Sequence, residues 1–153
     1  MKLSGKKMMI AGCAALLAAC SDGPTGIVGT QMEMHRARQT WNSQGVDDYR
    51  MTVRLTGAWF GGSAVVTVRD GVPVSVQPVG DGNIGPGAGD LWSHYDTVEE
   101  LFGIVEHAID ENADRLHATF HDRYGIPVEV DIDYRENWAD DEQGFAVETF
   151  DRL

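Results

Sequence analysis

Five acidic side chains gather near the end of the sequence, and their carboxylates could bind a divalent cation. They are Asp131, Asp133, Asp140, Asp141 and Glu142. Calcium takes about six to eight oxygen ligands, and carboxylates on one strand and the following loop could supply several of them. The D-x-D-x-D-G pattern of calcium loops is absent. The same residues therefore also fit a solvated acidic face, which is the interpretation we favour.

Other residue types that often carry chemistry do not form a recognised pattern here. His107, His117 and His121 could suggest a zinc site, but no H-E-x-x-H motif or cysteine partner accompanies them, so we expect exposed or edge histidines. Residues 93–96 read Ser-His-Tyr-Asp, yet catalytic triads are assembled from distant positions and no G-x-S-x-G elbow is present. We predict no catalytic residue and no cofactor.

A thiol near the start of the chain is placed for lipid attachment. All three lysines precede an apolar run over residues 8–19, which ends in Leu-Ala-Ala directly before Cys20. A basic head and a short apolar core are typical of a secretory signal, and the run is too short for the ~20 residues of a membrane-spanning helix. The pattern resembles the lipobox of bacterial lipoproteins, in which the cysteine is acylated. We expect residues 1–19 to be a signal peptide and Cys20 to anchor the protein.

The composition beyond Cys20 limits which partners are expected. The chain after Cys20 contains nine arginines and 24 carboxylates, so its formal charge is −15. Such a negative charge repels nucleic acid. Both cysteines, Cys13 and Cys20, lie in the export region, so the rest of the chain has no thiol for disulfides. We expect the bilayer, through acylated Cys20, and an envelope protein as partners. Ser21, by resemblance to lipoproteins of two-membrane hosts, favours the periplasmic face of the outer membrane.

The first half of the remaining chain predicts a tether, a helix and three strands. Residues 20–29 are rich in small and turn-forming types and are expected to form a flexible tether before a single α+β domain over residues 30–153. Thr30 and Glu33 have the spacing of a capping box, which predicts a helix over residues 31–43. Alternating and β-branched runs predict strands over residues 49–55, 63–69 and 72–77. Asp70-Gly71 predicts a type I′ hairpin turn between the last two.

The second half repeats this order. The glycine-rich residues 80–90 are predicted to be irregular, and Thr97 and Glu100 form a second capping box before a helix over residues 98–115. Strands are predicted over residues 117–124, 128–134 and 145–150. The expected fold is α+β, with helices packed on one face of an antiparallel sheet in the order αβββαβββ. That order is compatible with a duplicated αβββ unit.

Short motifs from Trp41 to the end of the chain resemble those of a known group. They are Trp41 and Tyr49, Asp70-Gly71, residues 97–102 (TVEELF), residues 120–127 (FHDRYGIP), Ile132-Asp133, and Asp140-Asp141-Glu142. The group is the bacterial lipoproteins that share a domain of unknown function, DUF6174. Where that family tends to read Y-D-P-x-Y-G-Y-P, this chain has His121, Arg123 and Ile126. The family brings no established activity.

The sequence leaves two classes of function open. The leading hypothesis is a membrane-anchored lipoprotein of the cell envelope that acts as a non-catalytic binding or accessory domain. The alternative is an envelope hydrolase or divalent-cation-binding protein that uses the acidic cluster. For residues 122–127 we favour a structural hairpin turn, with Tyr124 packed on the sheet, over a recognition loop.

Overall fold

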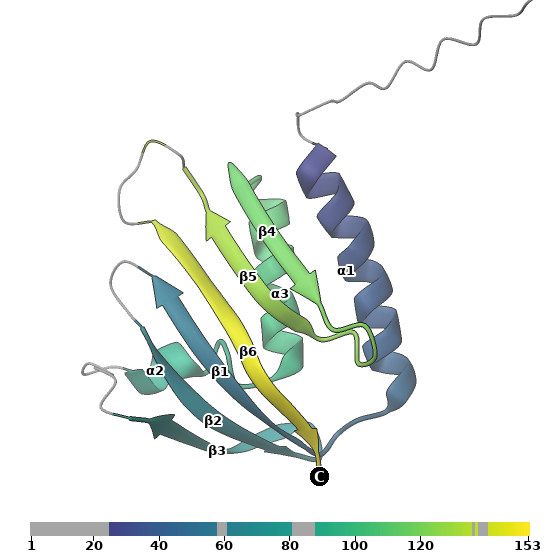
Figure 1. Cartoon of the computed structure of the whole chain (residues 1–153), viewed down its shortest axis with the longest axis vertical. Helices are drawn as coiled ribbons and strands as arrows, with labels where there is room; N and C mark the ends of the chain where they lie inside the picture. The colour runs from purple at the N-terminus through teal and green to yellow at the C-terminus, as the bar shows by residue number, and fades with distance from the viewer. Residues whose placement is uncertain (1–24, 58–60, 81–87, 136, 138–140) are drawn as a thin grey trace, which may run out of the picture.

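One antiparallel sheet and three helices make up the part of the chain that the structure describes (Figure 1). The structure is a computed structural model, and it describes residues 25–57, 61–80, 88–135, 137 and 141–153. The helices are α1 (Thr25–Gln44), α2 (Ala88–Trp92) and α3 (Val98–Asp110). The strands are β1 (Tyr49–Gly57), β2 (Gly62–Arg69), β3 (Val72–Val79), β4 (Arg115–Phe120), β5 (Pro127–Asp133) and β6 (Glu142–Arg152).

The two groups of three strands meet through β1 and β6. The strand order is β3-β2-β1-β6-β5-β4, and all neighbours are antiparallel. The predicted α+β class with an antiparallel sheet is confirmed. The first group lies in the order β3-β2-β1 and the second in the order β6-β5-β4. A duplicated αβββ unit stays a prediction.

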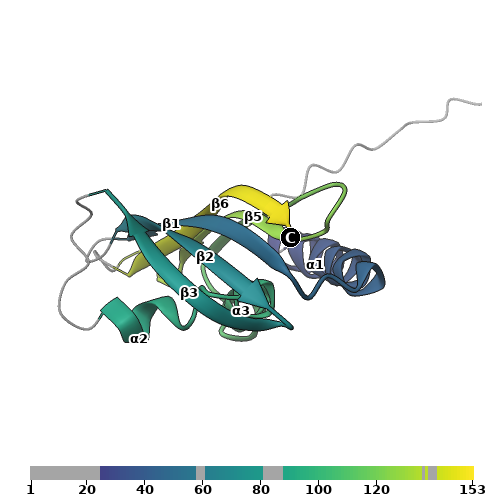
Figure 2. The same ribbon diagram turned by 90° about the horizontal axis from the view of Figure 1, so that it is seen from below.

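The core lies between the sheet and the helices. Met51, Val53 and Leu55 of β1 are buried while Arg54 between them is exposed, as expected for a strand with one buried face. The buried side of α3 includes Phe102, and α1 contributes its own apolar side chains to the same core. Figure 2 shows α2 and α3 beneath the sheet. Each fully buried large apolar side chain contributes roughly 1.5–3 kcal/mol to folding.

Two of the predicted local signals are confirmed in detail. Asp70 and Gly71 have φ values of +50° and +73°, and they join β2 to β3 as the predicted tight turn. Thr97 is the N-cap of α3, and its Oγ1 accepts a hydrogen bond from the Glu100 backbone N–H at 3.1 Å. These signals depend on a few neighbouring residues, so they can be predicted without knowledge of the fold.

The start of α1 differs from the prediction. The helix begins at Thr25, and the Thr30 hydroxyl donates to the carbonyl oxygen of Gly26 at 3.0 Å, so Thr30 lies inside the helix and does not cap it. The predicted tether over residues 20–29 is therefore wrong for residues 25–29, where Ile27 packs against the core. Its first part, like the predicted signal peptide of residues 1–19, lies outside the described residues.

The other end points differ for local reasons. Helix α3 ends at Asp110, not at Arg115, because Asn112 adopts a φ of +53° and Ala113 N–H donates back to Ala108 O at 3.0 Å. The short helix α2 occupies the end of the segment predicted to be irregular, and residues 81–87 of that segment are outside the described residues. Among the described helices, none is long and apolar enough to cross a membrane.

Candidate functional site

The sheet face opposite α3 carries polar side chains and is called here the open face. Its side chains alternate with the buried ones, so Arg54 of β1, His117 of β4 and Asp131 of β5 are exposed on it. Side chains at paired positions of neighbouring strands share a face, so the strand register determines which side chains are neighbours on the open face.

Two rows of paired residues cross the open face, one from β4 to β6 and one from β4 to β1. Arg115 lies opposite Asp133, which lies opposite Glu142. In the next row His117 lies opposite Asp131, which lies opposite Gly144 of β6, and Gly144 lies opposite Thr56. The sheet thus brings together residues that are up to 88 positions apart in the sequence, from Thr56 to Gly144.

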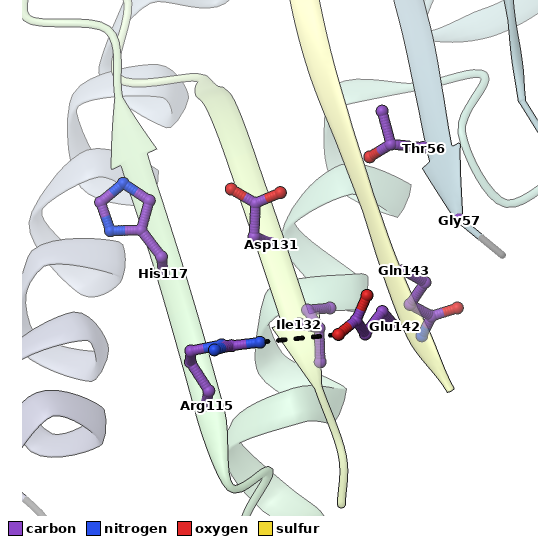
Figure 3. A pocket seen from close by; sticks show the side chains of 8 residues that line it. All are labelled: Thr56, Gly57, Arg115, His117, Asp131, Ile132, Glu142 and Gln143. Atoms are coloured by element: carbon purple, nitrogen blue, oxygen red, sulfur yellow. Dashed lines mark ion pairs between the residues drawn. The ribbon is translucent and has the colours of Figure 1, made fainter. Parts of the chain in front are cut away.

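An open hollow of about 630 Å³ lies over these rows (Figure 3). It is lined by Thr56, Gly57, Arg115, His117, Asp131, Ile132, Glu142 and Gln143. Gly144 lies between Asp131 and Thr56, and a Cβ atom there would overlap the carbonyl oxygen of Val130. It would also lie 3.0 Å from Thr56 Oγ1 and 3.1 Å from Asp131 Oδ1. The glycine therefore allows two oxygen-bearing side chains to approach the same point.

Charges of both signs surround the hollow. Nη2 of Arg115 lies 3.0 Å from Oδ2 of Asp133 and 3.8 Å from Oε1 of Glu142. Asp133 is only 5% exposed, whereas the side chain of Arg115 is 66% exposed, so the arginine lies over a buried carboxylate. Oδ1 of Asp133 is also buried and has no hydrogen-bond partner among the described residues. Removing Arg115 would leave this buried charge uncompensated.

The predicted acidic cluster is only partly assembled by the structure. Asp131, Asp133 and Glu142 share the open face, and Asp140 is outside the described residues. Asp141 is half-buried, and its Oδ1 has no hydrogen-bond partner in the part of the chain that the structure describes. Within the described part of the chain, no group of three or more histidine, cysteine, aspartate or glutamate side chains could hold a metal ion. The calcium site stays a prediction, as does lipidation of Cys20, which also lies outside the described residues together with Ser21.

The histidines take up different positions, and so do the residues of the Ser-His-Tyr-Asp run. His117 lines the hollow, while His107 is on α3 beside Tyr134, with ring centroids 6.1 Å apart. The Ser93 hydroxyl donates to the carbonyl oxygen of Asp90 at 2.7 Å and so belongs to the end of α2. Burial raises the pKa of the Asp96 carboxyl, and a nearby glutamate adds to the rise.

The turn between β4 and β5 is structural, as predicted. Nδ1 of His121 accepts hydrogen bonds from the backbone N–H groups of Arg123 and Tyr124, at 3.1 and 3.3 Å. Gly125 has a φ of +73°, and a Cβ atom there would overlap the Ala37 carbonyl oxygen of α1. The Gln44 side chain donates to the carbonyl oxygens of residues 123 and 124, at 3.2 and 3.0 Å. The turn is therefore fixed against α1.

Three aromatic residues of the sequence motifs, Trp41, Tyr49 and Tyr124, meet in one cluster. Trp41 contacts Tyr49 edge to face with ring centroids 5.6 Å apart, and Phe150 of β6 contacts both of them and Tyr124. The Tyr49 hydroxyl accepts a hydrogen bond from the Val98 backbone N–H at 3.0 Å. Burial raises the pKa of Tyr49 to about 12. These contacts join helices to strands, so these motif residues stabilise the fold.

The sequence does not point to several residues in and beside the hollow. The predicted helix over residues 98–115 includes Arg115, and no motif includes Thr56 or Gly144. A glycine within a strand pattern is a known sign of close approach and could have drawn attention to Gly144. The others depend on the register between β4, β5, β6 and β1, which the sequence does not state.

The arrangement offers acceptors for a basic group. Exposed Asp131 and Glu142 can accept hydrogen bonds, and Arg115 and His117 can orient a partner that also carries an acceptor. The family model described as "Family of unknown function (DUF6174)" matches residues 33–152. No curated protein and no solved structure matches the chain significantly. The family match covers most of the chain, so the protein belongs to this family.

Proposed function

We propose that this member of the DUF6174 family is a non-catalytic binding or accessory domain of the cell envelope. In this proposal acylated Cys20 holds the domain to the bilayer, and Ser21 favours the periplasmic face of the outer membrane in a two-membrane host. The hollow on the open face is the partner site. The observation that carries the proposal is a hollow lined by exposed carboxylates on the sheet face that α3 does not cover.

The charge around the hollow favours a partner with a basic group. The side chain of Glu142 is 70% exposed, and its ion pair with Arg115 is long at 3.8 Å, so Glu142 can also accept a hydrogen bond from a second cation. Asp131 is exposed and leans toward Thr56 over Gly144. A guanidinium or ammonium group entering the hollow would make charge-assisted hydrogen bonds to both carboxylates. The net negative charge of the chain would speed the encounter with such a partner.

The test is capture of an envelope protein by crosslinking in cells, with the full-length lipoprotein. Asp131→Asn with Glu142→Gln removes the two exposed charges, and Glu33→Gln with Asp110→Asn is the matched control at exposed positions on the helices. Charge-assisted hydrogen bonds contribute about 1.5–3 kcal/mol each, so capture should fall by about tenfold or more in the first pair only. Equal capture by both pairs would contradict the site.

Asp133 is left unchanged in this test because it is buried beneath Arg115. Reversing its charge would place a cation against an arginine and would test folding instead of binding. The Cys20→Ala form serves as the unanchored control. Loss of capture in that form, with binding retained by the purified domain, would attribute the role of Cys20 to location and not to contact with the partner.

A divalent-cation site in the same cluster is the second candidate, and it is also the metal-dependent form of the hydrolase alternative. It is supported by the buried Oδ1 atoms of Asp133 and Asp141, for which the described residues supply no hydrogen-bond partner. A cation bound only by the folded protein at about 100 times its Kd would stabilise it by about 2.7 kcal/mol. Thermal unfolding with calcium, magnesium or zinc checks this candidate. An unchanged Tm with all three ions would exclude it.

A further inference from the structure

The first two turns of α1 expose apolar side chains on one side. Val28 is 56% exposed and Met32 is 53% exposed. Positions four apart in a helix share a face, so these two side chains lie next to each other. Ile27 is half-buried and packs against the core. The helix is thus attached to the domain on one side and presents Val28 and Met32 on another.

This stretch is uncharged in a strongly acidic chain. Residues 25–32 contain no aspartate, glutamate, lysine or arginine, and the first charged side chain of α1 is Glu33. A surface without carboxylates is not repelled by anionic headgroups, unlike most of this protein. Strand β3, which carries the exposed Val72 and Val74, lies at the other end of the molecule from the start of α1 in Figure 1.

The covalent chain limits how far this stretch can be from the acyl anchor. Cys20 is five residues before Thr25, and five residues span at most about 18 Å when fully extended. With a rise of about 1.5 Å per residue, Val28 and Met32 follow within about two further helical turns. An acylated Cys20 would therefore hold both side chains close to the headgroup region.

We propose that Val28 and Met32 dock α1 onto the surface of the bilayer beside the acyl anchor. This inference rests on the proposed lipidation of Cys20. Two side chains of this size cannot hold a domain on a membrane alone, because even one acyl chain gives only marginal binding. Attachment makes the contact intramolecular, with an effective concentration of about millimolar, so the docked state becomes populated. The docked helix would fix the orientation of the domain on the membrane.

The test uses a fluorophore at either of two exposed apolar positions. Cys13 lies in the predicted signal and Cys20 would be acylated, so Met32→Cys or Val74→Cys supplies the free thiol for an environment-sensitive dye. The full-length acylated proteins are reconstituted in vesicles of phosphatidylethanolamine and phosphatidylglycerol that contain brominated lipid. We expect quenching at position 32 to be about twofold or more that at position 74. Adding Val28→Glu should reduce it to the level at position 74.

The outcomes separate this inference from the proposed anchoring. Equal quenching at both positions, in proteins shown by mass spectrometry to be acylated and bound to vesicles, would overturn the docking of α1 and leave the anchor standing. Quenching at position 32 that Val28→Glu does not change would also overturn it. A protein that cells produce without acyl chains would overturn both proposals.

Discussion

The hydroxyl of Tyr49 links β1 to the start of α3, and removing it tests how much this link contributes to stability. It accepts a hydrogen bond from the Val98 backbone N–H at 3.0 Å, and both residues are buried. Val98 begins α3, so its N–H has no acceptor within the helix. Tyr49→Phe keeps the ring contacts with Trp41 and Phe150 and leaves this donor unpaired. A buried donor without a partner costs about 1–3 kcal/mol.

Urea unfolding followed by circular dichroism measures the loss in the free energy of unfolding, and thermal unfolding measures the corresponding fall in Tm. For a domain of this size each kcal/mol corresponds to about 3–4 °C in Tm, so Tyr49→Phe should lower Tm by about 3–12 °C. Tyr124→Phe changes a half-buried ring of the same aromatic cluster and is the matched control, expected to cost less than about 0.5 kcal/mol. A loss below about 0.5 kcal/mol for Tyr49→Phe, or equal losses in both variants, would refute the reasoning.

The same hydroxyl gives a dependence on alkaline pH. Burial raises the pKa of Tyr49 to about 12 in the folded protein, and an unfolded tyrosine ionises near about pH 10. The folded state holds the proton more tightly, so this contribution is full below about pH 10 and is lost as pH rises through about 12. The stability difference between the wild type and Tyr49→Phe should therefore shrink over that range. A difference that grows with pH would contradict the assignment.

Three further predictions concern the glycines and one carboxylate. Gly144→Ala should cost about 1–3 kcal/mol in urea unfolding because its methyl group meets the backbone of β5, whereas Gly103→Ala on α3 meets open space and should stabilise by up to about 1 kcal/mol; equal effects would contradict the packing. Gly125→Ala should cost at least about 2 kcal/mol, because its φ of +73° and the overlap with α1 both oppose a side chain, and a smaller loss would mean that the turn can move. The backbone N–H of the β2–β3 turn, and then Arg69, hold the pKa of Asp48 below its usual value, so its stabilisation is present at neutral pH and is lost as pH falls through the lowered pKa. The urea midpoint of Asp48→Asn should therefore fall less than that of the wild type as the pH is lowered, and equal falls in the two proteins would contradict this role of Asp48.

Predictions from the sequence succeeded where the determining residues are neighbours. The Asp70-Gly71 turn and the Thr97 cap each depend on about four consecutive positions, and both are present. The Thr30 cap failed although its spacing is the same, because Ile27 packs on the core and extends α1 toward the N-terminus. Tertiary burial outweighs a local cap when the apolar contact lies beyond it.

The arrangement of the sheet and of the hollow could not be predicted in the same way. The pairing of β1 with β6 joins residues about a hundred positions apart, such as Tyr49 and Arg152, and no local sequence pattern predicts it. The prediction placed Asp131 and Glu142 near each other along the chain. It could not place Thr56 beside them, because Thr56 reaches the hollow only through the register of β1 on β6.

The central position of β6 also determines when the sheet can be completed during folding. Strands β1, β2 and β3 can pair as soon as they are synthesised, but the inner edge of β1 has no strand partner until β6, the last strand in the chain order, emerges. Until then β1 exposes unpaired backbone groups to other chains, which is a risk for aggregation. Closure over such a long loop is slow because its entropy is lost before the contacts form. A chain that stops before β6 would thus hold the three-stranded unit β1–β2–β3 and the hairpin β4–β5 without the strand that joins them.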